Sequence, residues 1–418
     1  FGVSLAAAVP AGGAAAVYLT TVIGYLLPGS AVLPLRYVAA VVAVAGIRWS
    51  LNGIQGLTGR ALFAPLVTFL GVECTGFAMA AAEGLSVHTI LTILAEGLLA
   101  AGAAAEQVVL TLTVGGDCVL GTREEWQQEE GTFLTVVAER GMDWPFRNLR
   151  EIFLEDDMTL LNLECVLQAD NQGHDYGKQH TFRGDPAYAE MLPRAGVEQV
   201  NVANNHFIDY RATGQASTLT ALEAAEVAYS GFGHLYIWEA EGVRIGFGGC
   251  REAVWKESPQ TVRKDIRALQ EAECDVIIYS CHWGKEYSPT HNRTQERMAD
   301  YAIDCGADIL IGAHPHVVQG IEKRNGALVL WSLGNLVFGG THEMTTFDAM
   351  LAQLELHFRD GEFTGTQLRL LPVLTSGAIP ANDFSPVLAQ GEDRERILAQ
   401  VAADSPQGLA DVMWFAGR

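Results

Sequence analysis

Polar side chains of the kinds that bind metal ions follow six short apolar runs in the second half of the chain, at the point where each run ends. The runs cover residues 108–114, 159–163, 200–203, 276–280, 309–311 and 328–331. The side chains that follow them are, in the same order, Asp117, Glu164, Asn205 with His206, His282, His314 with His316, and Asn335. Carboxylates, amides and imidazoles together are typical of sites for transition-metal ions. The spacing therefore predicts a metal centre.

The elements that must position these residues are predicted to be strands of an α/β sheet. The six runs are rich in β-branched residues, and helical stretches lie between them, as expected for buried strands. Ligands collect at the carboxyl ends of such strands because loops from different strands converge there. Mixed nitrogen and oxygen ligands favour Mn, Fe or Zn over Ca. We therefore expect an α/β domain that holds one or two divalent transition-metal ions.

The turn over residues 312–316, with the sequence GAHPH, is the most specific of these ligand patterns. Pro315 fixes the local backbone, which helps to direct His314 and His316 toward different ions. The alternative is that one of the two histidines is a hydrogen-bonded loop residue. Asp117 likewise has an alternative role, as the N-cap of a helix.

Charge divides the chain into two unlike parts. Residues 1–105 hold only three arginines and three glutamates, so the remainder carries the whole formal charge of −22. An acidic domain is a poor binder of nucleic acid, because neutralising phosphates requires a basic face. We therefore expect no nucleic-acid partner.

Residues 1–105 are predicted to form membrane-spanning helices. Their apolar stretches lie at about 4–27, 31–47, 61–82 and 87–105. These lengths are close to the roughly 20 residues that span a bilayer. The alternative is the buried helical bundle of a soluble protein, although soluble helices need a polar face that these stretches barely have. Because the chain starts at Phe1 rather than at methionine, we also expect an upstream part.

Four segments of this first part resemble the multi-spanning membrane region of stage II sporulation protein E. They are 1–5 (FGVSL), 35–39 (LRYVA), 46–49 (GIRW) and 94–100 (LAEGLLA). The phosphatase domain of that family is not visible in the rest of the chain. The resemblance therefore concerns the predicted membrane part alone.

A second resemblance covers roughly residues 107–375. Seven motifs follow the order of the CapA family of poly-γ-glutamate capsule synthesis proteins, which belongs to the calcineurin-like metallophosphatase superfamily. The motifs are 116–121 (GDCVLG), 162–164 (NLE), 182–186 (FRGDP), 203–210 (ANNHFIDY), 282–284 (HWG), 312–317 (GAHPHV) and 332–335 (SLGN). The resemblance implies a β-sandwich flanked by helices. It also implies a membrane-anchored domain, usually outside the cytoplasm, that acts in synthesis, release or anchoring of an anionic polymer.

The resemblance further implies roles for individual residues. Glu164 stands where the superfamily has a metal-bridging Asp and could bridge with a longer side chain, or it could form a structural salt bridge. Asn205 would give a carbonyl oxygen to one metal. His206 would act as general acid at the leaving oxygen of the substrate. The alternative is a loop histidine that orients Asp209 or Asn204.

Three further residues are candidates for binding substrate: Arg183, Asn204 and Trp283. Arg183 could bind a phosphate or carboxylate oxygen bidentately, and it could equally anchor a turn. Trp283 would form a wall of the pocket.

The chain departs from the superfamily at its first motif. The superfamily has Asp-x-His, and the corresponding residues here are Asp117, Cys118 and Val119. Valine cannot bind a metal, so one metal position has lost an imidazole. The number of ions therefore stays open at one or two.

The expected organisation has three parts: membrane helices over 1–105, a CapA-like metallophosphatase-fold domain over 106–375, and a C-terminal extension over 376–418 with a charged surface helix. Three functions follow. The chain could be a metal-dependent hydrolase or transferase acting on an anionic cell-surface polymer or a phosphoester. It could be a non-catalytic, metal-stabilised component of a polymer synthesis complex. It could also be a sporulation membrane fragment fused to this domain.

The side of the membrane is open at this stage. Arg48 and Arg60 lie in the polar loop 48–60, which the positive-inside rule puts in the cytoplasm. Two further crossings would leave the metal-binding domain in the cytoplasm as well. The CapA resemblance implies the opposite side.

Overall fold

Two β-sheets packed face to face form the centre of the part that the computed structural model describes, residues 107–341, 343–410 and 412–417. Within those residues the first sheet has nine strands in the order β17-β16-β15-β1-β3-β6-β7, with β14 beside β1 and β18 beside β16. Their bounds are β1 Gln107–Val119, β3 Met158–Leu163, β6 Gln199–Asn201, β7 Ala228–Ser230, β14 Asn335–Phe338, β15 Asp348–Arg359, β16 Glu362–Leu374, β17 Val387–Leu388 and β18 Val412–Ala416.

The second sheet has six strands among the described residues, in the order β12-β13-β11-β10-β9-β8. Their bounds are β8 Tyr236–Ala240, β9 Val243–Arg251, β10 Val276–His282, β11 Ile309–Ala313, β12 Ile321–Arg324 and β13 Ala327–Leu330. A small third sheet joins β2 (Thr122–Arg123), β5 (Phe182–Gly184) and β4 (Val166–Leu167).

The six strands predicted from the apolar runs are confirmed as β1, β3, β6, β10, β11 and β13. In β10, Val276 and Ile278 enter the core between the two sheets, while Ile277 and Tyr279 enter the core between the second sheet and its helices. Both faces of the strand are therefore buried, which is why these runs are continuously apolar rather than alternating.

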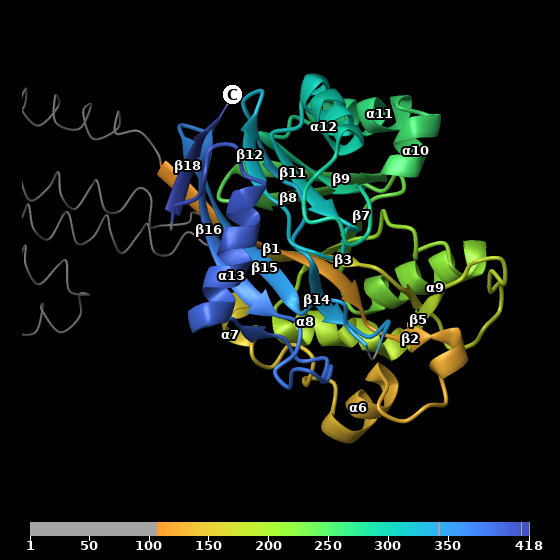
Figure 1. The fold of residues 1–418 in the computed structure, drawn as a ribbon. Helices are drawn as coiled ribbons and strands as arrows, with labels where there is room; N and C mark the ends of the chain where they lie inside the picture. The colour runs from red at the N-terminus through yellow and green to blue at the C-terminus, as the bar shows by residue number, and fades with distance from the viewer. Residues whose placement is uncertain (1–106, 342, 411, 418) are drawn as a thin grey trace, which may run out of the picture. The chain divides into compact units, whose positions relative to one another are not determined.

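Helices cover the outer face of each sheet (Figure 1). Those packed on the first sheet are α6 (Phe133–Arg140), α7 (Arg150–Glu155), α8 (Met191–Ala195) and α9 (Arg211–Ala224), with the 3-10 turns η1 (Glu124–Trp126) and η2 (Pro186–Glu190) in the same region. Those packed on the second sheet are α10 (Glu252–Glu257), α11 (Gln260–Glu271) and α12 (Arg293–Cys305). The layers helix, sheet, sheet and helix fit a metallophosphatase-like fold, as the resemblance implied.

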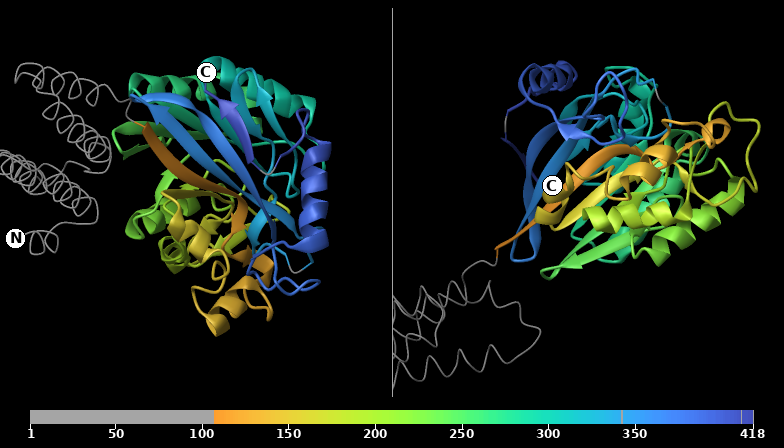
Figure 2. Two further views of the ribbon diagram at one scale, coloured as in Figure 1. Left: turned by 90° about the vertical axis from the view of Figure 1, so that its left-hand side faces the viewer. Right: turned by 90° about the horizontal axis from the view of Figure 1, so that it is seen from below.

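The stretch after residue 375 belongs to the same compact unit, Val108–Arg418. Its strands β17 and β18 both pair with β16. The helix α13 (Gly391–Ala403) lies along β15 and β16, with Ile397 and Val401 buried (Figure 2). The C-terminal stretch therefore completes the first sheet.

No helix within the described residues is long and apolar enough to cross a membrane. The predicted membrane segments over 1–105, and the resemblance to the sporulation protein, lie outside the described residues.

Candidate metal centre

Five of the predicted ligands meet where strands of the two sheets end, and we call them the ligand cluster: Asp117, Glu164, His282, His314 and His316. Asp117 lies near the end of β1, Glu164 follows β3 and His282 ends β10. Their ligand atoms form two groups, one of Asp117, Glu164 and His282 and one of Glu164, His314 and His316. Within each group the atoms lie within 4.8 Å of one another. Glu164 belongs to both groups.

Short distances connect the members of the ligand cluster. His282 Nε2 lies 3.3 Å from Glu164 Oε1, and His316 Nδ1 lies 3.2 Å from Asp117 Oδ2. His316 Nδ1 also lies 3.9 Å from Glu164 Oε2. The ring centroids of His282 and His314 are 4.6 Å apart. The residues that the sequence predicts as ligands are therefore brought together.

The unpartnered atoms of this cluster test whether it fits a metal ion. Within the described residues, neither oxygen of Glu164 has a hydrogen-bond partner, and neither does Nδ1 of His282 or of His314. Leaving a buried carboxylate or imidazole nitrogen without a partner costs free energy. A divalent cation would satisfy these atoms, so the donor set fits one.

The pKa shifts in the ligand cluster agree with binding of a divalent cation. Burial raises the pKa of Glu164 well above its usual range, and the charge of Asp117 raises it further. Burial lowers the pKa of His282 well below its usual range, and the nearby His314 and His316 lower it further. In Asp117 burial opposes the net shift, but the hydrogen bond and charge of His316 lower the pKa. The neutral imidazole of His282 is the form that binds metals.

The backbone of the loop after β11 is strained. His314 has φ 96° and His316 has φ 58°, and both values lie in the left-handed region that non-glycine residues rarely adopt. The amide N–H of His314 donates to Asp117 Oδ2 at 3.2 Å. Strain of this kind concentrates at binding and catalytic sites, where the surrounding structure holds it in place.

A close backbone approach sets the position of Asp117. A Cβ added to Gly116 would lie 1.9 Å from the carbonyl oxygen of Gly334, so only glycine fits there. The neighbouring Asp117 N–H donates to that same oxygen at 2.9 Å. The GG sequence at 115–116 therefore lets β1 and the loop before β14 converge on the site.

Asparagine side chains contact two residues of the ligand cluster and orient them. Asn162 Nδ2 donates to Asp117 Oδ1 at 2.7 Å, and Asn201 Nδ2 donates to Asn162 Oδ1 at 2.9 Å. Asn335, which is in register with Asp117, has its Oδ1 at 2.9 Å from His316 Nδ1. Asn335 follows the sixth apolar run, so the pattern of strand ends marks it, although the ligand motifs do not.

Val119, at the position of the missing histidine, is fully buried in the core beneath the helices of the first sheet. Cys118 lies in the same core, and burial raises the pKa of its thiol to about 12. Neither residue supplies a ligand.

Asn205 contacts the ligand cluster directly, because its Oδ1 meets Nε2 of His282. The next residue belongs to a second group, Lys178, Phe182, His206 and Asp209, which we call the His206 cluster. In it His206 Nδ1 lies 2.7 Å from Asp209 Oδ2, and that oxygen also accepts the Phe182 N–H at 2.7 Å. This contact uses Nδ1 of His206 and not Nε2.

Lys178 completes the His206 cluster. Its Nζ pairs with Asp209 Oδ1 and donates to the carbonyl oxygen of Asn205 at 2.6 Å. The ring of Phe182 lies against that of His206, with 4.1 Å between centroids. Burial lowers the pKa of His206, and the hydrogen bond to Asp209 opposes this shift. The sequence offers Asp209 as a neighbour of His206, but it gives no sign of Lys178.

The three residues predicted to bind substrate are engaged elsewhere. The guanidinium of Arg183 donates to Glu124 Oε2 at 2.8 Å and to the carbonyl oxygens of Gln168 and Ala169. These contacts match the alternative of a turn anchor.

Asn204 donates to the Leu163 carbonyl at 2.7 Å and accepts the N–H groups of His206 and Phe207, so its amide holds the loop together. Trp283 is fully buried in the core beneath the helices of the second sheet, and its Nε1 donates to the Trp331 carbonyl at 2.9 Å. The expectation that Trp283 lines a pocket is therefore wrong in this structure, because its side chain points away from the ligand cluster.

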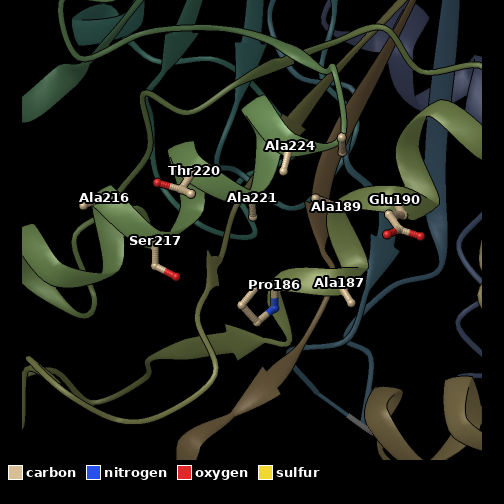
Figure 3. A pocket seen from close by; sticks show the side chains of 10 residues that line it. Pro186, Ala187, Ala189, Glu190, Ala216, Ser217, Thr220, Ala221 and Ala224 are labelled. Carbon is tan, nitrogen blue, oxygen red and sulfur yellow. The ribbon is translucent and has the colours of Figure 1, made fainter.

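A hollow of about 500 Å³ lies between η2 and α9 (Figure 3). Small side chains line it, among them Ala187, Ala216 and Ala221, and no predicted ligand does. The chemistry that the residues offer is therefore in the ligand cluster and not in this hollow.

The helix-flanked β-sandwich, with buried carboxylates and imidazoles at its strand ends, fits a metallophosphatase-like fold. The sequence profile of the family described as bacterial capsule synthesis protein PGA_cap matches residues 111–340, and the chain belongs to that family.

Two curated relatives are similar over most of the chain. The capsule biosynthesis protein CapA of Bacillus anthracis is 26% identical over 336 residues, covering 72% of this chain and 75% of the relative. The PGA biosynthesis protein CapA of Bacillus subtilis is 28% identical over 319 residues, covering 71% of this chain and 79% of the relative. A solved structure of a hypothetical protein from Thermus thermophilus is 18% identical with a TM-score of 0.39, covering 63% of this chain and 99% of that chain.

Proposed function

We propose that this chain is a metal-dependent hydrolase or transferase that acts on an anionic polymer, or on a phosphoester of its precursor, in capsule or poly-γ-glutamate synthesis. Membership of the PGA_cap family supports the biological setting, and the relatives are named for capsule and PGA biosynthesis. The ligand cluster supports the chemistry.

One observation carries the proposal. Glu164 takes part in both groups of candidate ligands, and neither of its buried oxygens has a hydrogen-bond partner among the described residues. A carboxylate in that position suits a bridge between two ions, as in two-metal hydrolytic sites.

The residues have separable roles in this proposal. Those that would hold metal are Asp117, Glu164, Asn205, His282, His314 and His316. The chemistry that a divalent ion supplies there is stabilisation of negative charge that develops on the reacting group. His206 would give a proton from Nε2 to the leaving oxygen when its ring is protonated on both nitrogens, and Asp209, which accepts from Nδ1, favours that imidazolium form. Mn, Fe or Zn suits this donor set.

The test uses the full chain before and after treatment with a chelator. Metal content is measured together with turnover of a simple phosphodiester, bis(p-nitrophenyl) phosphate, and cleavage of γ-linked polyglutamate. We expect the protein to contain Mn, Fe or Zn and to turn over at least one of the two substrates. Treatment with the chelator should remove both the metal and this turnover. A protein that carries no metal and gains no thermal stability from Mn or Zn would contradict the proposal.

A non-catalytic, metal-stabilised component of a synthesis complex is the second candidate. The observation that favours it is Val119, which gives no ligand where the superfamily has a histidine. Metal binding without turnover of either substrate would support this candidate over the first.

We also propose that residues 1–105 are membrane helices that anchor the domain, with the domain outside the cytoplasm and in contact with a polymer synthase complex. The composition of these residues and the family resemblance support this proposal. Protease accessibility of residues 106–418 in intact cells tests the side, and the alternative of a sporulation membrane fragment predicts no association with polymer synthesis genes or products.

A further inference from the structure

Arg251 ends β9, in the extended conformation, and its partner in the parallel register with β10 is His282 of the ligand cluster. The preceding pair, Cys250 and Cys281, lies in the core beneath the helices of the second sheet. Successive side chains of a strand point to opposite faces. Arg251 and His282 therefore both point to the inner face, between the sheets, at the edge where the ligands meet.

The charges near Arg251 agree with this placement. Burial lowers the pKa of Arg251, and the charges of Cys250, of Glu257 and, least of the three, of Asp209 in the His206 cluster oppose the shift. Burial likewise lowers the pKa of His282, and the charge of Arg251 contributes. The guanidinium is therefore within electrostatic reach of both clusters.

The guanidinium of Arg251 has no partner of its own. Within the part of the chain that the structure describes, its nitrogens form no hydrogen bond and no ion pair, although the side chain is partly buried. Two other cations of the region differ in this respect, because Lys178 pairs with Asp209 and Arg183 with Glu124. Arg251 is only partly buried, so part of the residue stays open to solvent.

An unpaired, partly desolvated guanidinium costs free energy in the unliganded protein. Proteins retain such groups at binding sites, where the ligand supplies the missing partner. The planar fork of arginine matches the oxygens of a phosphate or a carboxylate. A chain with a formal charge of −22 also repels anions in general, so an anionic substrate needs local positive charge.

We propose that Arg251 binds a negatively charged oxygen group of the substrate, a phosphate or a carboxylate, and holds it beside the candidate metal centre. The inference rests on the proposed function, which assigns a reacting anionic substrate to that centre. It adds a substrate-binding residue that the sequence motifs do not mark.

The test compares Arg251→Gln and Arg251→Lys with the unchanged protein, all as the full chain. Arg369→Gln is the matched control, because Arg369 is an exposed residue of β16 and its loss changes the net charge equally. Three quantities are measured: metal content, melting temperature, and affinity for two probes by calorimetry. The probes are inorganic phosphate and a short γ-linked glutamate oligomer, which separate a phosphate ligand from a carboxylate ligand.

We expect Arg251→Gln to bind at least one probe roughly 10- to 100-fold more weakly, the usual worth of a charge-assisted pair. The affinity of Arg251→Lys for the probe should lie between those of the unchanged protein and Arg251→Gln, because lysine keeps the positive charge but lacks the planar guanidinium. Metal content should not change. The melting temperature of Arg251→Gln should be unchanged or higher, because an unpaired buried charge has been removed. The control should match the unchanged protein.

Three results would overturn the inference: millimolar probes that do not bind the unchanged protein, equal affinity in Arg251→Gln, or a lower melting temperature with loss of metal, which would indicate a structural role. The proposed function fails separately. Probe binding that depends on Arg251 in a protein without turnover would keep this inference and reject the hydrolase. Undiminished turnover and probe affinity in Arg251→Gln would reject this inference and keep the proposed hydrolase.

Discussion

The ligand cluster and the His206 cluster are neighbours, joined where Asn205 contacts His282, yet they differ in how their buried atoms are satisfied. In the ligand cluster, both oxygens of Glu164 lack a hydrogen-bond partner within the described residues. In the His206 cluster, both oxygens of Asp209 are engaged, by His206 and the Phe182 N–H on one side and by Lys178 on the other.

The difference separates a site whose buried atoms an added cation would satisfy from one whose buried carboxylate already has partners. Buried polar atoms without partners are costly, and a metal ion is the simplest way to satisfy carboxylates and imidazoles together. A fully hydrogen-bonded group is rigid, and rigidity suits a residue that must present one nitrogen to a substrate. The predictions below follow from this contrast, and all use the full chain.

The largest effect is expected from His206→Ala. If the His206 cluster serves chemistry and not metal binding, the variant should keep its metal and lose turnover by about 10²–10⁴, the usual contribution of a positioned acid. His234→Ala is the control, because His234 is exposed. Metal loss with unchanged turnover per bound ion would assign His206 to the ligand cluster instead.

Glu164→Gln should abolish the stabilisation of the protein by metal. Saturating Mn or Zn should stabilise the unchanged protein by about 4 kcal/mol at a thousandfold excess over Kd. The variant should lose this gain. Without metal it should melt higher than the unchanged protein, because a buried carboxylate beside Asp117 is replaced by a neutral amide that can donate to it. Melting curves with and without metal measure both effects, with the exposed Glu139→Gln as control. A metal-free variant that melts lower would show that Glu164 is structurally paired.

Asp209→Asn should destabilise the protein by about 2–4 kcal/mol, with or without metal. The reason is that Asp209 is fully buried and has three partners, one of which is the ammonium group of Lys178. Denaturant unfolding measures the change, and the exposed Asp304→Asn serves as control. A loss that appears only in the metal-loaded protein would show that the two clusters act as one unit.

The smallest effect concerns Asp156, outside both clusters. Burial raises its pKa from 3.8 to about 7, and the charge of Glu198 contributes. The folded state therefore holds an extra proton between those pH values, so the contribution of Asp156 to stability falls as pH rises from about 4 to about 7. Asp156→Asn should remove this slope and be more stable above pH 7 by about 1–2 kcal/mol, after allowing for partial exposure. An unchanged slope would assign the pH dependence to other groups.

Much of the site could be predicted from the sequence, because its information is local. A buried strand leaves a continuous apolar run, and a ligand at its end lies within a few residues of that run. The rule that carboxyl ends of parallel strands converge brings Asp117 toward Glu164 in the first sheet and His282 toward His316 in the second. Only the packing of the two sheets brings these two pairs together.

The direction of individual side chains was decided only by tertiary structure. Arg183 and Trp283 stand in ligand motifs, yet the first pairs with Glu124 and the second packs in a core. Arg251 stands in no motif, yet strand register sets it beside His282. A motif shows which residue follows a strand. The contacts of that side chain come from elements distant in the chain, so they are decided only when the sheets and helices pack.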